Sequence, residues 1–354
     1  MKKTVSVIVL LALIVGILSG ISVLASDDTT NPVFMPQEVT LDRKIDIVKN
    51  VSENFDRERC FYDLSTEDPE WVEVGSTAAR RRLLHLDESV FTDLPTEEVF
   101  RAVMEYPFIN DLMAFNTPEL AVEGLSRHCT ALKVFVSRPD AWQVLQAAMS
   151  DVEGLTAKVE TTTLTKTLFN AYLNVLDQYF VFREQPAFSL GARVLPMNML
   201  YNEDIYTPNG TNVRDCLRNN EYSESMLLNL DRQFTAEFPQ ATLYMHSTNL
   251  YNCHGYAWHL AERMRNSTLS FSEKQVWMLN PSVYMNDGSY SRVTRVNQAS
   301  HVFYYNDNHS ALVYDAAGNS MGNAWLISKW TFGPVMIHRV GDCPYDEPVS
   351  LWVR

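Results

Sequence analysis

Hydrophobic and polar positions follow two different patterns along the chain, and the change comes near residue 195. From about residue 38 to that point, apolar residues recur three and four positions apart, which is the spacing of one helix face. Beyond it the apolar runs are short and rich in β-formers, with clusters of Asn, Asp and Gly between them. The pattern predicts an α+β protein in which a helical array precedes an antiparallel sheet.

Helix start signals mark several segments of the first half. Thr117, Pro118 and Glu119 have the order N-cap, first-turn proline and first-turn acid, and apolar positions continue at helical spacing to Val136. Residues 93–97 open a similar segment, and the runs 140–152 and 163–180 repeat the pattern. Helices that follow one another with short breaks predict a bundle or an irregular helical array.

The second half is rich in aromatic residues: 12 of the 16 Tyr and five of the seven Trp lie beyond residue 200. A helix-compatible run starts near Cys253 and extends to about residue 265, after the polar residues 247–249. Six segments are predicted as strands: 275–279, 291–296, 302–305, 311–314, 324–330 and 335–340.

The first 25 residues have the pattern of an export signal. Two lysines precede an uncharged apolar run over residues 5–25, and residues 23–25 (Val-Leu-Ala) form a small-residue cleavage site. The alternative is a membrane anchor, because the run is just long enough to span a bilayer. We therefore expect a secreted or extracytoplasmic protein that contacts a membrane only if this segment stays uncleaved. The predicted division is a signal peptide (1–25), a linker (26–37), a helical domain (38–194) and an α+β domain (195–354).

Charge and cysteine spacing exclude several classes of partner. The chain has 29 Lys and Arg against 43 Asp and Glu, a net charge of −14, which argues against sequence-general binding of nucleic acid, since that binding depends on basic side chains. The five cysteines include no C-x-x-C pair, and no H-E-x-x-H motif occurs, so we expect no metal and no cofactor. An odd number of cysteines in an exported protein leaves at least one thiol free or paired between chains.

Cys253 is the strongest candidate for chemistry. It stands in the string Tyr-Asn-Cys-His-Gly-Tyr-Ala-Trp, residues 251–258, at the predicted start of a helix. The unpaired backbone N–H groups and the dipole of a helix N-terminus favour a thiolate over a thiol. The same N–H groups can hold the oxyanion that forms when a thiolate attacks a carbonyl. The alternative is a buried structural thiol or one half of a disulfide.

A thiolate nucleophile needs an imidazole, and the neighbouring histidines are badly placed by helix geometry. On a helix His254 points about 100° away from Cys253, and His259 also leaves its face. His309 is the preferred base, because it opens the predicted strand 310–314 after an Asn-Asp-Asn turn. The competing assignments are a solvated turn histidine at this position, no partner at all, or a base at His246, His301 or His338.

A third residue that orients the imidazole is expected on the following strand. Ser328 is preferred and Asn323 is the alternative, because strand alternation alone does not settle the choice without the register. Asn252 and Asn249 either donate to an oxyanion or simply cap the helix. The aromatic residues of this half either line a groove for sugar rings or peptide, or pack in the core; they are Tyr251, Tyr256, Trp258, Trp325 and Trp330.

The order Cys253, His309 and a polar residue on the next strand resembles that of the papain-like cysteine peptidases and amidases. The interval of 56 residues from Cys253 to His309 is similar to that of the compact NlpC/P60 and CHAP amidases of bacterial cell walls. Short strings between residues 207 and 345 also resemble a group of exported bacterial proteins on this fold. They include Cys-His-Gly-Tyr-Ala-Trp (253–258), His-Ser-Ala (309–311) and Ser-Lys-Trp (328–330). The resemblance implies a helix that carries the cysteine, packed on an antiparallel sheet, and it does not extend to the helical half.

Together these features predict a secreted thiol hydrolase. It would cleave amide bonds in peptidoglycan peptides or other extracellular peptides by Cys–His acyl transfer. The alternative is a non-catalytic cell-surface binding module on the same fold. A transpeptidase, in which an amine accepts the acyl group in place of water, has the same sequence features.

Overall fold

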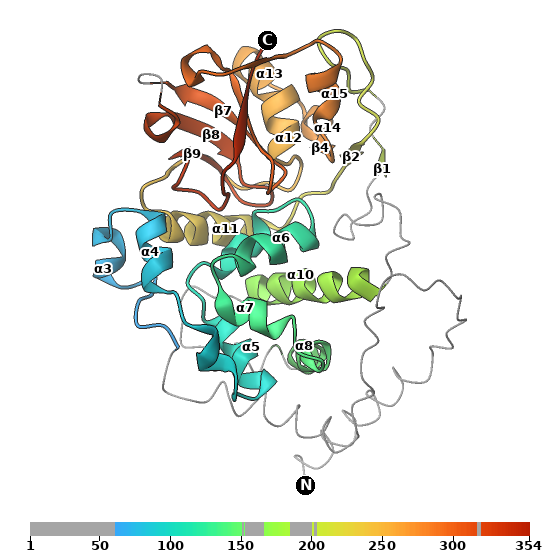
Figure 1. Cartoon of the computed structure of the whole chain (residues 1–354). Coiled ribbons are helices and arrows are strands. Elements are labelled where there is room, and N and C mark those ends of the chain that lie inside the picture. The colour runs from blue at the N-terminus through green and yellow to red at the C-terminus, as the bar shows by residue number, and fades with distance from the viewer. Residues whose placement is uncertain (1–60, 151, 153–165, 185–199, 202–203, 317–319) are drawn as a thin grey trace, which may run out of the picture. The chain divides into compact units, whose positions relative to one another are not determined.

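The computed structural model describes residues 61–150, 152, 166–184, 200–201, 204–316 and 320–354. These residues belong to one compact unit of helices and antiparallel strands, which confirms the α+β class (Figure 1). The predicted signal peptide (1–25), the linker (26–37) and the predicted domain boundary at residues 194–195 lie outside the described residues. In the described ranges, no helix combines the length and the apolar composition that crossing a membrane requires.

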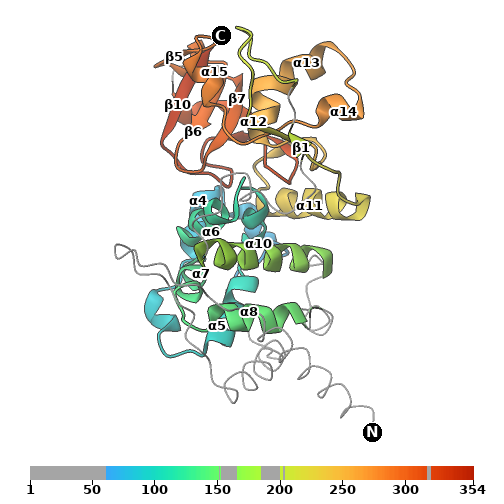
Figure 2. The same ribbon diagram turned by 90° about the vertical axis from the view of Figure 1, so that its right-hand side faces the viewer.

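The first part of the described chain is helical, as predicted. Two 3-10 helices, Glu88–Phe91 and Ile109–Met113, accompany the α-helices. Helix α10 lies alongside α8 and also contacts α11 (Glu224–Glu237) of the second half (Figure 2). The α-helices are α3 (Pro69–Glu73), α4 (Thr77–Leu83), α5 (Thr96–Met104), α6 (Pro118–Ser126), α7 (Thr130–Phe135), α8 (Ala141–Ser150) and α10 (Lys166–Glu184).

The start signal at Thr117 is confirmed, but the helix after it is shorter than predicted. The Thr117 side chain accepts a hydrogen bond from the Leu120 N–H, and Pro118 is the first residue of α6. The apolar spacing predicts one segment to Val136, whereas the chain leaves the helical conformation at Cys129 (φ −106°, ψ 94°) and α7 starts at the next residue. The apolar spacing persists across this break because both helices bury one face in the same core.

A seven-stranded antiparallel sheet forms most of the second half, in the order β3-β9-β8-β7-β6-β10-β5. Four of the predicted strands are confirmed as β6, β7, β8 and β9, and residues 291–296 form β5 followed by a 3-10 turn. The strands β3 and β10 were not predicted from the sequence. The strands are β3 (Thr242–Met245), β5 (Ser291–Val293), β6 (His301–Tyr304), β7 (His309–Asp315), β8 (Trp325–Lys329), β9 (Val335–Arg339) and β10 (Val349–Val353).

A second, three-stranded sheet and four short helices complete this half. The predicted strand 275–279 belongs to the small sheet, where β4 (Trp277–Met278) pairs with β2 (Cys216–Arg218), and β2 pairs with β1 (Leu200–Tyr201). The helix predicted from Cys253 consists of α12 (Cys253–Gly255), a π-helical turn (Tyr256–Leu260) and α13 (Ala261–Asn266). The other two helices are α14 (Phe271–Lys274) and α15 (Ser282–Asn286).

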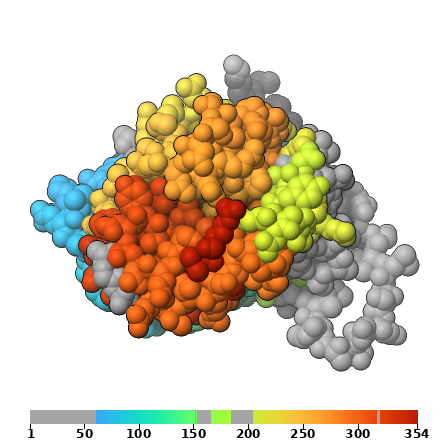
Figure 3. Space-filling view, turned by 90° about the horizontal axis from the view of Figure 1, so that it is seen from above, coloured from blue at the N-terminus to red at the C-terminus, as the bar shows by residue number. Residues whose placement is uncertain are grey.

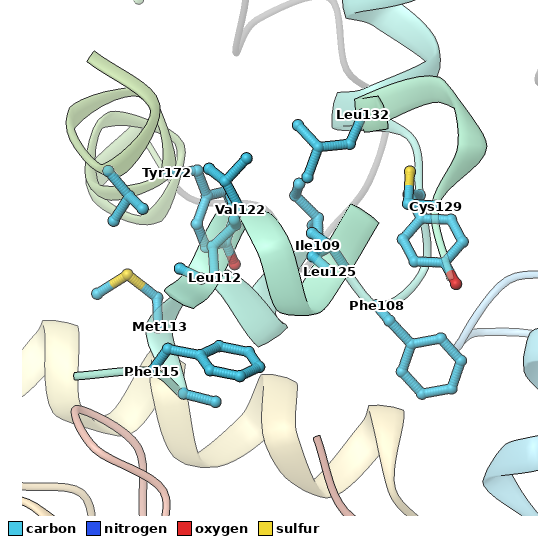
Figure 4. Packing of buried hydrophobic residues seen from close by; sticks show 14 of the residues in the cluster. Phe108, Ile109, Leu112, Met113, Phe115, Val122, Leu125, Cys129, Leu132 and Tyr172 are labelled. Atoms are coloured by element: carbon cyan, nitrogen blue, oxygen red, sulfur yellow. The ribbon is translucent and has the colours of Figure 1, made fainter. Parts of the chain in front are cut away.

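The two faces of the large sheet bury different cores. On one face, residues such as Leu326, Trp330 and Met336 join the core of the helical half. A chain of aromatic contacts makes the connection: the Phe238 ring lies 5.3 Å from Phe108 and 4.8 Å from Trp330 between ring centroids. Figure 4 shows the helical side of this core, where Phe108, Leu112 and Phe115 surround α6.

The other face of the sheet packs against the helical run that starts at Cys253. Leu312 and Ile327 of the sheet contact the cluster that contains Tyr251 and Trp258. Close approach to β4 explains Gly255 in this run, since a Cβ atom there would lie 1.9 Å from the Val276 carbonyl oxygen. The helix N-terminus is thus held between the small sheet and the large one.

Candidate functional site

Cys253 is the first residue of α12, as predicted. The Asn252 side chain caps the helix, because its Oδ1 accepts the Gly255 N–H at 3.0 Å. Among the described residues Cys129, Cys216, Cys253 and Cys343 are all free thiols. The alternative of a disulfide to Cys253 from any of the other three is therefore excluded.

Polar groups converge on the Cys253 sulfur from three parts of the chain. The Asn116 amide donates to Sγ at 3.3 Å, and His254 Nδ1 lies 3.7 Å from it. The backbone N–H of Ser310 in β7 also lowers the pKa of the thiol. Asn116 comes from the loop between the 3-10 helix Ile109–Met113 and α6, so the helical half contributes directly to the surroundings of Cys253.

Asn116 is the centre of a buried hydrogen-bond network. Its Nδ2 donates to the Asn308 carbonyl at 2.9 Å, and its Oδ1 accepts from Asn252 Nδ2 at 3.0 Å and from Thr331 Oγ1 at 3.2 Å. Two residues that hydrogen-bond Asn116 have a left-handed backbone conformation: φ is 45° at Asn308 and 43° at Thr331. Such conformations cost energy for residues other than glycine, and the network around Asn116 helps to hold them.

The surroundings of the sulfur favour the thiol in this state. Cys253 is 0% exposed, and burial raises the pKa of its thiol above the ordinary value. The Asn116 amide, the N–H groups of Ser310 and His254, and the Lys329 ammonium all act in the opposite direction, with smaller effect. The expected thiolate is therefore not the favoured form here, because the loss of solvent outweighs the helix N-terminus and its N–H donors.

His309 opens β7 as predicted, but its ring does not hydrogen-bond the sulfur. The ring stacks on Tyr345 with centroids 3.5 Å apart and meets Tyr304, its cross-strand partner, edge-on at 5.5 Å. Within the described part of the chain neither ring nitrogen has a hydrogen-bond partner. Since neighbouring strand residues point to opposite faces, Ser310 faces α12 and His309 lies on the other side, with Tyr304.

The imidazole next to the sulfur is that of His254, which helix geometry had argued against. Ser310 Oγ lies 2.8 Å from His254 Nδ1 and also accepts the Trp258 indole N–H at 2.7 Å. The contact with Ser310 Oγ orients the His254 ring towards β7. In this orientation the ring also lies next to the Cys253 sulfur. Burial lowers the pKa of His254 to about 3, so the ring is neutral.

Ser328 and His338 form a separate buried pair. Trp330 Nε1 donates to Ser328 Oγ at 3.1 Å, and the Ser328 hydroxyl lies 2.8 Å from His338 Nε2. The Trp330 indole can only donate, so the Ser328 hydroxyl hydrogen is available for His338 Nε2, and His338 Nδ1–H donates to the Arg339 carbonyl at 2.9 Å. Because the His309 ring nitrogens have no partner, neither Ser328 nor Asn323, which is exposed, orients that ring here.

The other candidate histidines lie in contacts of their own. His301 Nε2 donates to the Ala257 carbonyl at 2.9 Å, and its Nδ1 lies 2.8 Å from Ser300 Oγ. The exposed side chain of His246 pairs with Asp231 at 2.7 Å. Neither makes a hydrogen bond to the Cys253 sulfur.

The residues named for oxyanion or substrate contacts have mainly structural partners. Asn252 donates both amide hydrogens, to Asn116 Oδ1 and to the Met278 carbonyl, and Asn249 donates to the Asn220 carbonyl. Tyr251 is buried below the Lys329 ammonium, 5.6 Å from its ring centroid, and Trp330 is in the core. Trp258, also named for substrate contacts, lines a cavity.

Lys329 is a buried lysine whose charge affects the Cys253 thiol, and it was not among the predicted site residues. Its ammonium donates to the carbonyls of Thr331 and Gly333. Burial lowers its pKa to about 7, and the nearby Glu221 and the Cys253 thiol act in the opposite direction. Lys329 follows Ser328, the residue preferred from the sequence, in the string Ser-Lys-Trp (328–330).

Comparison of this chain with protein-family models, with curated proteins and with solved structures finds no match. Within the described ranges no three His, Cys, Asp or Glu side chains converge as metal ligands.

Proposed function

We propose that the protein is a thiol hydrolase that cleaves amide bonds in peptidoglycan peptides or other extracellular peptides. The observation that carries the proposal is the convergence on one free sulfur, at a helix N-terminus, of the Asn116 amide and the Ser310 N–H beside an imidazole. These are the groups that thiol acyl transfer needs: a nucleophile, donors for an oxyanion, and a ring that carries a proton. Residues 1–25 direct the protein out of the cytoplasm in this proposal.

His309 is the preferred general base in this reaction. His254 Nδ1 is engaged by Ser310 Oγ, whereas both ring nitrogens of His309 are without hydrogen-bond partners in the described chain. A buried imidazole with two unpaired nitrogens is costly, and function is a common reason for keeping one. Because the ring lies on the face of β7 opposite to α12, the role requires it to leave its stack on Tyr345 and the start of β7 to change conformation.

The reaction then follows acyl transfer. His309 takes the proton from the Cys253 thiol, and the sulfur attacks the carbonyl carbon of the scissile amide. The tetrahedral oxyanion is stabilised by N–H donors, the leaving amine takes the proton from His309, and a thioester remains. Water, deprotonated by His309, attacks the thioester, and the carboxylic acid leaves as the thiol is restored.

The structure is the covered state of the site in this proposal. Asn116 occupies the space next to the sulfur, Cys253 is 0% exposed, and Tyr345 lies flat on His309. The Tyr345 hydroxyl donates to the Ala114 carbonyl at 2.6 Å, so the two covering elements are joined to each other. A substrate carbonyl reaches the sulfur only after the loop 114–116 moves.

Alkylation and hydrolysis together test the proposal. Iodoacetamide is applied to the protein and to Asn116→Ala between pH 6 and pH 9, and peptide mapping identifies the modified cysteine. Cys129, Cys216 and Cys343 are internal controls, because burial raises the pKa of each to about 12. We expect selective modification of Cys253 in Asn116→Ala, and release of amines from peptidoglycan peptides that Cys253→Ala abolishes.

A non-catalytic binding module on the same fold is the second candidate. It is favoured by the burial of Cys253 and by the absence of a hydrogen bond between its sulfur and the unpartnered His309 ring. In that case Cys253 resists alkylation in both proteins, Cys253→Ala leaves any retention on peptidoglycan unchanged, and no amine is released. That combination would overturn the hydrolase proposal.

A further inference from the structure

A cavity of about 310 Å³ lies beside α13, away from the groups that contact the Cys253 sulfur. Residues 206–208, the helical run 257–265 and Arg354 at the end of the described chain bound it. Figure 3 views this end of the molecule, with the dark red end of the chain next to the yellow-green segment that contains residues 206–208. Asn116, His254, Ser310 and Tyr345 are not among the lining residues, so the cavity is a separate feature.

Four aromatic rings form the floor of the cavity. His301 stacks on Trp258 with centroids 4.6 Å apart and meets Tyr290 edge-on at 4.6 Å, and Tyr284 lies 5.9 Å from Trp258. His301 is neutral, because burial lowers its pKa to about 4 and both ring nitrogens have hydrogen-bond partners. The floor is a neutral surface on which a flat ring or the apolar face of a sugar can stack.

Three arginines and one carboxylate stand around this floor. Arg263 pairs with Glu273 at 3.1 Å and Arg354 with Glu262 at 2.9 Å, and in both pairs the side chains are exposed. Exposed pairs of this kind contribute about 0–1 kcal/mol, so a ligand can compete for them. Arg265 Nε donates only to the Ala261 carbonyl, at 3.4 Å, and in the described chain its guanidinium has no carboxylate partner.

The charges of two of these arginines lower the pKa values of side chains in the floor of the cavity. Arg265 and Arg354 both lower the pKa of His301 through their charges, and Arg354 has the same effect on Tyr290. The chain as a whole carries a net charge of −14. Three guanidinium groups around one aromatic cavity are therefore a local concentration of positive charge on an acidic protein. Guanidinium groups bind carboxylate and phosphate oxygens in paired, directional hydrogen bonds.

We propose that this cavity binds a small organic anion in which a ring is joined to a carboxylate or phosphate group. The ring stacks on Trp258, Tyr290 and His301, and the anionic group pairs with Arg265. The volume is at the lower end of the range for ligand pockets, which fits one ring with its anionic group rather than a polymer segment. The site is independent of Cys253 and stands whether or not the protein is a hydrolase.

Calorimetric titration of the full chain with matched probes tests the site. Benzoate and phenyl phosphate carry a ring and a charge, benzyl alcohol carries only the ring, and inorganic phosphate carries only the charge. We expect the ring-bearing anions to bind about tenfold more tightly than either partial probe, because neither partial probe makes both contacts. The tighter of benzoate and phenyl phosphate identifies the anionic group.

Substitution of one arginine distinguishes specific binding in the cavity from nonspecific attraction of anions to the protein surface. Arg265→Met is expected to weaken the binding of the ring-bearing anions about tenfold, while Arg295→Met, an exposed arginine outside the cavity, leaves it unchanged. Thermal unfolding of both variants checks that the fold is intact. Equal binding by Arg265→Met and the unchanged protein, or binding of benzyl alcohol as tight as that of benzoate, would overturn the proposal.

Discussion

The Asn116 amide donates a hydrogen bond to the Cys253 sulfur across 137 positions of sequence, at 3.3 Å. Asn116 belongs to the helical half, and Cys253 begins the helix that packs on the sheet. This hydrogen bond therefore links the helical half to the sheet half at Cys253, the candidate nucleophile. It also means that the stability of the fold and the reactivity of the thiol depend on the same side chain.

Asn116→Ala is expected to lower the free energy of unfolding and to expose the thiol. The substitution removes the acceptor of the Asn252 and Thr331 donors and leaves those groups buried without it, which costs about 1–3 kcal/mol. Urea denaturation measures the loss, and Asn266→Ala, at the exposed end of α13, is the matched control. Equal stability of Asn116→Ala and the control would contradict the network described for Asn116.

Gly255→Ala is expected to destabilise the protein because its Cβ atom would lie 1.9 Å from the Val276 carbonyl oxygen. That oxygen belongs to the backbone just before β4, so α12 or this segment must shift, and overpacking of this kind costs about 1–3 kcal/mol. Gly341→Ala is the control, since no atom lies within 4 Å of the Cβ position there. Thermal unfolding compares the two, and a Tm of Gly255→Ala equal to that of Gly341→Ala would show that α12 is not held against β4.

Lys329 is expected to make stability rise with pH. Burial lowers its pKa from 10.5 to about 7, so between these values the unfolded chain binds the proton and the folded protein does not. The free energy of unfolding then rises with pH through this window, by up to about 1.4 kcal/mol per pH unit. The contribution is fully present above pH 10.5 and is lost as the pH falls to about 7.

Lys329→Met removes the titrating group and serves as the comparison. Denaturant unfolding of both proteins at pH 7, 8 and 9 gives the difference in free energy, which is expected to change with pH in favour of the unchanged protein. A constant difference across the three pH values would mean that Lys329 keeps its proton in the folded state.

Tyr345→Ala is expected to free the His309 ring. Burial holds the pKa of His309 well below its ordinary value, and the Tyr345 ring covers one face at 3.5 Å. Removing that ring admits water, so the pKa of His309 is expected to move towards 6.5. Imidazole NMR signals followed against pH measure the change, with the exposed His246 as the internal reference. An unchanged titration of His309 would show that other groups keep it buried.

Local sequence signals predicted local structure well. The cap at Thr117, the helix that starts at Cys253 and four strands of the large sheet were readable from residues near in sequence, and Asn252 takes the capping role that was one of its two alternatives. The strands β3 and β10 were not predicted; each pairs with strands that lie far away in the chain, so their place in the sheet depends on tertiary contacts. The predicted helix through Cys129 was too long, because apolar spacing continues across a break when both helices face one core.

Which side chains surround the Cys253 sulfur was harder to predict from the sequence. His254 was set aside by its angle on the helix, yet its ring is drawn towards β7 by Ser310 Oγ, a contact 56 positions away. His309 was placed correctly at the start of β7, but the pairing with β6 decides which face its ring takes. Asn116 carries no local signal for this role, since its position next to a helix cap is ordinary.

The sequence by itself determined where several helices and four strands of the large sheet lie, the position of Cys253 at a helix N-terminus, and the excess of acidic over basic residues. These depend on backbone preferences and on patterns within a few residues. Only the tertiary structure decided that Asn116 reaches the sulfur, that His309 lies against Tyr345, and that arginines gather around Trp258. The reason is physical: strand register and the docking of distant segments set the burial of each side chain and its partners, and burial sets the ionisation of the thiol.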